Sequence, residues 1–402
     1  MIEATGTEDQ ALDFLVNRND LADCKLVAAT PPGRQELRPG QVLMEISKFG
    51  LSSNNITYAV LGESLGYWKY FPAEDGWGRI PAWGFGRVMK TRHAQIEEGD
   101  RIYGYFPIST HHVAEFGPAA GELFVETSAH RSALPAVYNR YTRSARNGRA
   151  DPLRDDLHVV LRPLFTTSWL LDDFLADNGY FGARTLVISS ASSKTALGLA
   201  FLLSRRKDRP FEIVGLTAGA NMAFVKRTGF FDAVLAYESL DAIPRGHPAV
   251  FVDMAGNGEV ASAVHHHLAG ELKYSCRVGL THWNKPAREE ALPGAAPALF
   301  FAPAQSHKRV QEWGAEEFRR RLDAAWEQLA EMAARHLDIV RVSGPASVSR
   351  VYRDLLDRGA RPEQGHVLSW SSPARPTNTP LQHLRIDNHV PRNPPEKRAR
   401  RR

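Results

Sequence analysis

A run of polar side chains, Ser-Ser-Ala-Ser-Ser-Lys-Thr at residues 189–195, joins an apolar segment to a segment rich in helix-forming residues. Proteins often bind phosphate at such a strand-to-helix turn, because the backbone amides at the start of the helix point at the ligand. Nucleotide-binding turns usually carry glycines, and residues 189–195 contain none. The turn is therefore compatible with a dinucleotide site, a triphosphate site or no nucleotide site.

The triphosphate alternative depends on Lys194 and Thr195, which stand where a P-loop carries its Lys-[Ser/Thr] pair. Asp253, at the end of a later apolar run, resembles the carboxylate that holds magnesium in such proteins. However, Ile188 and Ser193 occupy the two glycine positions, and glycine permits the backbone to wrap around a phosphate. The sequence therefore disfavours a P-loop.

Apolar strand-like segments alternate with helix-like segments through the middle of the chain. This alternation predicts a doubly wound parallel sheet, which places ligands at the carboxyl ends of its strands. The predicted strands are 185–190, 211–217, 233–237, 249–256 and 273–281, and the predicted helices are 165–179, 194–206, 221–229 and 259–270.

The two ends of the chain have a different texture. The first third predicts strands at 24–29, 41–50, 80–90 and 99–107, with a long aromatic loop at 62–79. The last third predicts a long amphipathic helix at 315–336, a strand at 337–344, a helix at 347–359 and a strand at 366–370.

Several motifs, in this order, resemble the medium-chain dehydrogenase/reductase superfamily, and specifically its zinc-independent quinone-oxidoreductase-like branch. They are QVLMEISKFGLSSNNITYAVLG, IPAWGFGRV, GDRIYGYFP, LFTTSWLL, VISSASSKTALGLAF, GFFDAVLAY and DRGARPEQGHVLS. The resemblance covers about residues 25–370, and some of these stretches also resemble a bacterial subfamily of unassigned function. It implies an α/β fold in which a GroES-like β-rich domain at 1–156, completed by about 300–370, accompanies a Rossmann-type cofactor domain at 157–299.

The resemblance places the three glycines of the family's phosphate turn on Ser190, Ser193 and Ala196. Serine hydroxyls partly replace the glycine amides and Lys194 adds a positive charge, which implies a retuned phosphate site; a degenerate turn that binds nothing is the alternative. Residues 217–221 lack the acidic side chain that binds the ribose of NAD, so the sequence favours NADP(H) and disfavours NAD. The predicted cofactor-binding residues are Thr167, Ser190, Ser192, Ser193, Lys194, Thr195, Thr217, Asn221, Gly279 and Thr281.

A reductase without a metal needs hydrogen-bond donors or a proton donor for the charge that develops on its substrate. Tyr58 stands where zinc-independent relatives often carry a tyrosine near the nicotinamide, and His282 follows the strand predicted to end there. These two are the predicted catalytic residues, although a core tyrosine and a capped loop histidine are the alternative interpretations. The predicted substrate-binding residues are Asn54, Asn55, Tyr67, Trp68 and Trp83.

Composition excludes several other classes of protein. Cys24 and Cys276 are the only cysteines, and the family's zinc-binding Gly-His-Glu aligns with residues 81–83, Pro-Ala-Trp, so we expect no metal. The net charge of +5 comes from the basic tail at 371–402, which carries +6 and is predicted to be disordered, so we expect no nucleic-acid partner. We also expect no membrane partner and a cytoplasmic location, because no apolar run is long enough to span a membrane and the first residues lack a secretory signal.

Together these features predict a metal-free, NADPH-dependent reductase that passes hydride to an enone, quinone or carbonyl group. The expected partner is a small, mainly apolar or aromatic substrate. A homodimer is also compatible with the resemblance, with the strand at 273–281 as its contact. A lyase, hydratase or isomerase on the same scaffold is the alternative, and a binding or scaffold protein is a third.

Overall fold

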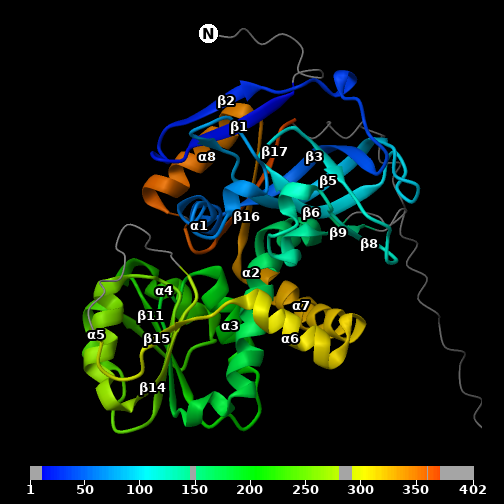
Figure 1. Cartoon of the computed structure of the whole chain (residues 1–402). Coiled ribbons are helices and arrows are strands. Elements are labelled where there is room, and N and C mark those ends of the chain that lie inside the picture. The colour runs from blue at the N-terminus through cyan, green and yellow to red at the C-terminus, as the bar shows by residue number, and fades with distance from the viewer. Residues whose placement is uncertain (1–10, 145–150, 280–291, 360, 372–402) are drawn as a thin grey trace, which may run out of the picture. The chain divides into compact units, whose positions relative to one another are not determined.

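The alternating apolar runs in the middle of the chain form a parallel sheet, as the sequence predicts (Figure 1). The computed structural model describes residues 11–144, 151–279, 292–359 and 361–371. These residues belong to one compact unit that ends at Ser371. Among them, no helix is both long and apolar enough to cross a membrane.

The parallel sheet has the strand order β12-β11-β10-β13-β14-β15. Numbered along the chain, this is the order 3-2-1-4-5-6 of dinucleotide-binding sheets. Successive strands are added on one side of β10 and then, from β13 onward, on its other side. The strands are Thr185–Ile188 (β10), Glu212–Thr217 (β11), Ala233–Ala236 (β12), Ala249–Asp253 (β13), Leu272–Arg277 (β14) and Pro297–Leu299 (β15). The carboxyl ends of β10 and β13 are therefore the expected place for a ligand.

Three helices connect these strands: α3 (Lys194–Ser204), α4 (Met222–Thr228) and α5 (Gly258–Leu268). Strands β10 and β13 are buried along their whole length. Burial on both faces explains why their sequences are continuously apolar instead of alternating.

The strand predicted as the contact of a homodimer, at 273–281, includes most of β14. Strand β14 is internal, because β15 pairs with it in parallel and places Pro297 beside Ser275. At this end of the described sheet the edge is therefore β15 and not β14. The sequence missed β15 because the strand is only three residues long.

The first and last parts of the chain share a mostly antiparallel sheet with the order β16-β17-β3-β5-β6-β9-β8. Its strands are Gln41–Leu51 (β3), Pro81–Thr91 (β5), Arg101–Pro107 (β6), Leu123–Val125 (β8), Arg140–Arg143 (β9), Asp338–Ser343 (β16) and Gln364–Ser369 (β17), and His111–Glu115 (β7) pairs with β3. The chain thus returns to the sheet of its first part, where β17 pairs with β3. A separate small sheet contains Leu12–Asn17 (β1), Cys24–Ala28 (β2) and Trp77–Gly78 (β4).

The remaining helices surround or connect the two large sheets. They are α1 (Ser53–Val60), α2 (Pro152–Asp177), α6 (Ala302–Trp313), α7 (Ala315–His336) and α8 (Pro345–Arg358). Helix α2 begins at Pro152 instead of residue 165, so the predicted domain boundary at 157 falls inside it. Pro163 lies within this helix and is a residue type that usually marks a helix end, yet buried apolar side chains continue on both sides of it.

Candidate active site

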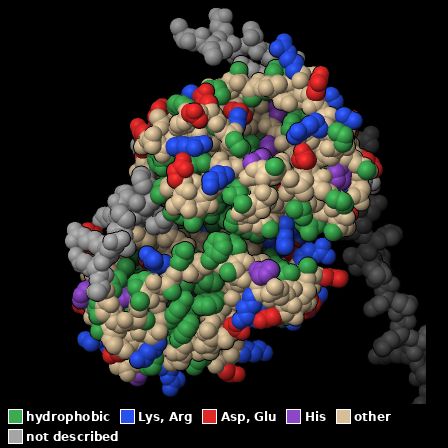
Figure 2. Space-filling model, viewed as in Figure 1, with side chains coloured by type: hydrophobic (Ala, Val, Ile, Leu, Met, Phe, Trp, Pro, Cys, Tyr) green, Lys and Arg blue, Asp and Glu red, His purple; other side chains and the backbone are tan. Residues whose placement is uncertain are grey.

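A cavity of about 1560 Å³ lies at the carboxyl ends of the parallel strands, between that sheet and the antiparallel sheet. Figure 2 shows a furrow between these halves of the molecule, with hydrophobic side chains gathered below it. Of the predicted site residues that the structure describes, the cavity brings together Asn54, Tyr58, Tyr67, Trp83, Thr167, Ser190, Ser192, Ser193, Lys194, Thr195, Asn221 and Gly279. Thr281 and His282 lie outside the described residues.

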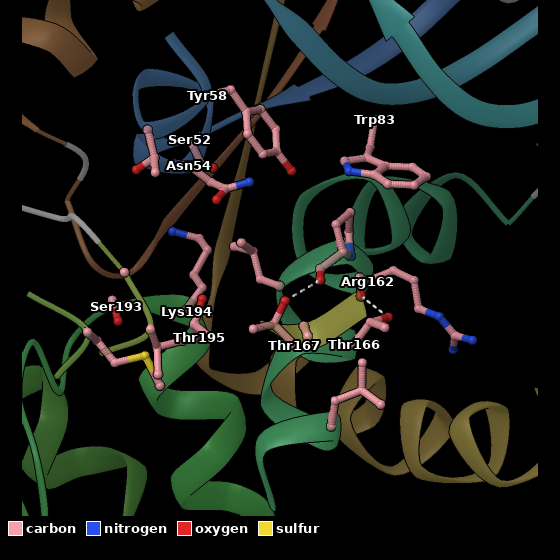
Figure 3. Close-up of a pocket in the computed structure, with 18 of the residues that line it drawn as sticks. Ser52, Asn54, Tyr58, Trp83, Arg162, Thr166, Thr167, Ser193, Lys194 and Thr195 are labelled. Atoms are coloured by element: carbon pink, nitrogen blue, oxygen red, sulfur yellow. Dashed lines mark hydrogen bonds between the residues drawn. The ribbon is translucent and has the colours of Figure 1, made fainter. Parts of the chain in front are cut away.

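The polar turn joins β10 to α3 and forms one wall of the cavity (Figure 3). Ser193 caps α3, since its hydroxyl accepts a hydrogen bond from the Ala196 amide at 3.3 Å. Ser190 has a φ of 49°, a left-handed backbone conformation that glycine adopts more easily. The resemblance that placed a family glycine on Ser190 therefore agrees with the backbone there.

Hydroxyl groups brace this turn against the neighbouring strands. The Ser189 hydroxyl donates to Asp253 Oδ1 at 2.6 Å and accepts from the Met254 and Ala255 amides. Asp253 also accepts from the Ala255 and Gly256 amides, so this carboxylate helps to order the loop after β13. The P-loop alternative loses support, because its proposed metal ligand is part of this bracing network.

The end of β11 is also bonded to the turn. The Ser192 hydroxyl accepts hydrogen bonds from the Thr217 hydroxyl and the Asn221 amide nitrogen, both at 3.2 Å. Thr217 is 1% exposed and lies outside the cavity lining, contrary to its prediction as a cofactor contact. Asn221 does line the cavity.

Lys194, the first residue of α3, extends into the cavity toward the start of α1, where Ser52 and Asn54 lie (Figure 3). Its ammonium makes no hydrogen bond or ion pair with any residue that the structure describes. Burial lowers the pKa of Lys194 to about 8, and the negative charge of Glu363 only partly opposes this effect.

On the opposite side of the cavity, Tyr58 lies in an aromatic cluster. It is 5% exposed, with its ring 4.6 Å from Tyr67 and 5.6 Å from Tyr105. Burial raises the pKa of Tyr58 well above its usual value, and the side chains of Trp83 and Asn54 partly oppose that rise. In Figure 3 the Tyr58 hydroxyl lies between those two side chains. The phenol is therefore neutral and able to donate a hydrogen bond.

Helix α1 holds Asn54 and Tyr58 in place through a capping box. Ser52 accepts from the Asn54 amide, and the Asn55 side chain accepts from the Ser52 amide at 2.8 Å. Asn55 also donates to the Pro81 carbonyl of β5 at 2.9 Å and is 5% exposed. Asn55 is therefore a structural residue that fixes α1 on the sheet, and its prediction as a substrate contact is not supported.

The two tryptophans predicted to bind substrate have different positions. Trp83 lines the cavity and stacks on Tyr103, with 5.6 Å between ring centroids. Trp68 is 3% exposed and fills a space beside Gly62 and Gly78, where an added Cβ would meet its ring. Trp68 therefore belongs to the core under the aromatic loop, and its prediction as a substrate-binding residue is wrong.

Helix α2 contributes residues that the sequence analysis missed. Arg154, His158, Arg162 and Thr166 all line the cavity, as Thr167 does. Their spacing of four residues along the chain places them on one helix face, and this signal was present in the sequence. Burial, followed by the nearby arginines, lowers the pKa of His158 to about 3, so its ring is neutral. Arg162 is paired with Asp323 of α7.

The cavity can accommodate a dinucleotide at the carboxyl ends of β10 and β13, where the strand order reverses. Gly279, after β14, approaches the loop after β13 so closely that an added Cβ would lie 2.7 Å from the Met254 carbonyl. Phosphates would face Lys194 and Thr195 at the start of α3, and a nicotinamide would face Thr167. Among the described ranges, no group of three or more His, Cys, Asp or Glu side chains is arranged to hold a metal.

A family model described as "Protein of unknown function (DUF2855)" matches residues 49–361. The chain belongs to this family. No curated protein sequence matches it. Solved structures do, at low identity. CurA from Vibrio vulnificus in complex with NADPH is 16% identical, with a TM-score of 0.58 over 90% of this chain and 99% of that chain.

Two further solved structures support the same fold. A mutant form of enoyl thioester reductase from Candida tropicalis is 11% identical, with a TM-score of 0.55, and the yhdH oxidoreductase from Salmonella enterica in complex with NADP is 12% identical, with a TM-score of 0.52. Each match covers 90% of this chain and 100% of the other. The DUF2855 chain therefore has the same two-part α/β fold as these structures, in agreement with the fold class that its sequence predicted.

Proposed function

We propose that the protein is a metal-free, NADPH-dependent reductase that passes hydride to an enone, quinone or carbonyl group of a small, mainly apolar substrate. One observation carries this proposal: a single cavity joins the phosphate-type turn at the start of α3 to the aromatic wall that contains Tyr58 and Trp83. A reductase needs both parts within one enclosure. The NADPH and NADP in two similar structures add support for a nicotinamide cofactor.

A bound NADPH would supply the hydride, and the side chains of this protein would handle the substrate. Rings of Tyr67, Trp83 and Tyr103 offer an apolar surface for a planar group. The Tyr58 hydroxyl would donate a hydrogen bond to the substrate oxygen, and Asn54 would help to orient that hydroxyl. The walls around these groups limit the access of water, which strengthens such polar interactions.

Calorimetric titration with NADPH and NADH is the first test, with Ser193→Gly alongside the wild type. Ser193→Gly should bind at least as well, because glycine is tolerated at a helix N-cap and frees the backbone of the turn. Consumption of NADPH with a panel of enones, quinones and aldehydes then identifies the acceptor. Failure of both nucleotides to bind would refute the reductase proposal.

One observation favours a second candidate, a lyase, hydratase or isomerase that needs no hydride. The Ser192 hydroxyl and its partners Thr217 and Asn221 fill part of the turn with the protein's own side chains. In that case Tyr58 would do acid–base work in a preserved cavity. Nucleotide binding without hydride consumption, across the whole panel of acceptors, would favour this candidate.

The proposal also retains expectations that follow from the sequence. It places the enzyme in the cytoplasm with a small-molecule substrate, without zinc, nucleic acid or membrane as partners, and allows a homodimer.

A further inference from the structure

The backbone amides of the polar turn are largely bonded within the protein. The Ser190 amide donates to the Tyr237 hydroxyl at 2.9 Å, the Ala191 amide to the Leu216 carbonyl at 2.9 Å, and the Ser193 amide to the Ser190 carbonyl at 2.7 Å. In a glycine-rich turn, backbone amides are directed at the phosphate of the ligand. Here the amides of Ser190, Ala191 and Ser193 hold the turn itself, which leaves the amides at the start of α3 for a ligand.

Two hydroxyl oxygens of the turn also help to hold it in place. The Ser192 hydroxyl accepts from Thr217 and Asn221, and the Ser193 hydroxyl accepts from the Ala196 amide. Each of these hydroxyls keeps its proton for a ligand, but neither carries a charge.

Lys194 is the one charged side chain of residues 189–195. Its side chain is half-buried, extends across the cavity (Figure 3), and pairs with no carboxylate among the described residues. A charge that is removed from water without a partner is costly, and an anion in the cavity would offset that cost. The hydroxyls of Ser193 and Thr195, on the same side of the cavity, suit the oxygens of a phosphate.

The other cations that line the cavity are arginines. Arg162 is paired with Asp323, and Arg154 with Glu327. Arg277, at the end of β14, also lines the cavity. At the end of β11, where a 2′-phosphate would lie, no lysine or arginine of the described residues lines the cavity. Lys194 is therefore the cation that belongs to the polar turn itself.

We propose that Lys194 binds the diphosphate of the ligand through its ammonium, in place of those turn amides that are bonded within the protein. The inference rests on the proposed function, because the diphosphate in question is that of a nicotinamide dinucleotide. The affinity would then come from an ion pair, so it would fall with rising salt concentration.

The test measures binding of two probes, NADPH and inorganic pyrophosphate, by calorimetry at low and physiological salt. Lys194→Gln should weaken both by about tenfold or more, since it removes a charge-assisted interaction. Lys194→Arg keeps the charge and should retain most of the affinity. Lys207→Gln is the matched control, because Lys207 is exposed beyond the other end of α3 and should leave binding unchanged.

The pH dependence gives a second signature of the same ion pair. Wild-type affinity should be constant below about pH 8 and fall above it, as the ammonium of the free protein loses its proton. Glu363 and His366 are the charged or titratable groups that act on Lys194 or respond to it. Burial, followed by the positive charge of Lys194, lowers the pKa of His366, so this ring does not change its charge above pH 7. Lys194→Arg should remove the decline.

The outcomes separate this inference from the proposed function. If Lys194→Gln binds both probes as the wild type does, the inference is wrong and the reductase proposal survives. If the wild type binds pyrophosphate but neither nucleotide, and the variant binds neither probe, the reductase proposal fails, and Lys194 binds the diphosphate of a ligand other than a nicotinamide dinucleotide. If the wild type binds neither probe, both fail.

A measurement on the wild type alone guards against a misfolded variant. Reaction of lysines with acetic anhydride, followed by peptide mass spectrometry, should show Lys194 protected by pyrophosphate and Lys207 unprotected. Equal labelling of Lys194 with and without pyrophosphate would overturn the inference.

Discussion

The hydroxyl of Tyr58 is the group in the cavity best placed to meet a substrate oxygen. Trp83 and Asn54 reach toward this phenol, and both lower its pKa, while burial raises it further (Figure 3). The phenol therefore keeps its proton and can donate it to an acceptor in the cavity. We expect Tyr58→Phe to lower the rate of NADPH consumption about 100-fold while leaving NADPH affinity unchanged, as measured by steady-state kinetics and calorimetry.

Tyr70 provides a matched control for this substitution. It belongs to the same aromatic cluster, but it lies outside the cavity lining and its hydroxyl donates to the Pro135 carbonyl. Tyr70→Phe should affect stability slightly and turnover little. Equal rates for wild type and Tyr58→Phe would show that another group serves the substrate oxygen.

Lys194 should also reduce the stability of the free protein. Its pKa falls from 10.5 to about 8 on folding, so the folded state holds this proton less tightly than the unfolded chain does. The penalty is fully present below pH 8 and disappears as pH rises through 10.5. We expect Lys194→Met to raise the free energy of unfolding by about 1–2 kcal/mol at neutral pH, after allowing for partial exposure.

Urea unfolding of wild type and Lys194→Met across the alkaline range checks this prediction. The difference in the free energy of unfolding between the two proteins should shrink as the pH approaches 10.5, the pKa of a free lysine. Lys207→Met should show no difference at either end of the range. A less stable Lys194→Met would mean that the aliphatic part of the lysine, and not its charge, dominates its effect on folding.

Residue types and spacing in the sequence identified much of the cavity lining, but they did not distinguish lining from support. Asn54 and Asn55 are neighbours in the chain, yet one faces the cavity and the other bonds to Pro81. The indole rings of Trp68 and Trp83 are equally suited to contact a substrate. Only the packing of Trp68 beside Gly62 and Gly78 assigns it to the core. Such differences depend on the register of each element, which the sequence alone does not supply.

At the scale of elements, the contact between α2 and α3 sets the position of the turn. Gly198 of α3 lies against α2, where an added Cβ would be 2.8 Å from the Ser168 hydroxyl. That hydroxyl donates to the Thr195 carbonyl at 2.7 Å and ties the first turn of α3 to α2. The spacing between Thr167 and Lys194 therefore depends on this glycine.

We expect Gly198→Val to lower the free energy of unfolding by about 2–3 kcal/mol, because overpacking outweighs the small gain in helix propensity. It should also weaken NADPH binding by moving the start of α3. Gly270→Val is the control, since Gly270 is exposed and an added Cβ there meets nothing within 4 Å. Urea unfolding measures the first effect and calorimetry the second. If Gly198→Val has the stability and the NADPH affinity of the wild type, α2 moves to accept the larger side chain at little cost.

Helix α2 also shows why a sequence predicts elements better than their ends. Its second half was predicted from the apolar pattern after residue 165, whereas the first half contains charged residues and Pro163. Tertiary packing extends the helix through Pro163, because Leu157, Val160 and Leu161 are buried in the core. The face that carries His158 and Arg162 was missed for this reason.

For the whole molecule, the order of motifs predicted the architecture, and the strand order 3-2-1-4-5-6 confirms it. Long-range order of this kind is recoverable because each strand has a strong apolar signal of its own. The additional strand β15 and helix α6 were not predicted, since one is short and the other is rich in polar residues.

Stability of the whole molecule should fall on mild acidification. His111, His112, His158, His265 and His366 all have lowered pKa values, and burial is the first cause for each. Below the ordinary pKa of 6.5 the unfolded chain binds protons that the folded protein does not, so acid favours unfolding. We expect the free energy of unfolding to fall by on the order of 3 kcal/mol between about pH 7.5 and about pH 5, measured by urea unfolding.

His158 should account for a separable part of this acid sensitivity. Its ring lies 4.3 Å from Tyr103 and 5.5 Å from Trp326, and Arg162, Arg154 and Arg101 add to the effect of burial in lowering its pKa to about 3. Phenylalanine fits the same aromatic contacts and binds no proton, so His158→Phe should reduce the loss of stability between about pH 6.5 and about pH 5 by up to about 2 kcal/mol. His266→Gln, on the exposed face of α5, should retain the wild-type slope. If His158→Phe also retains it, the ring is protonated in the folded state and the cavity is more hydrated around α2 than its packing indicates.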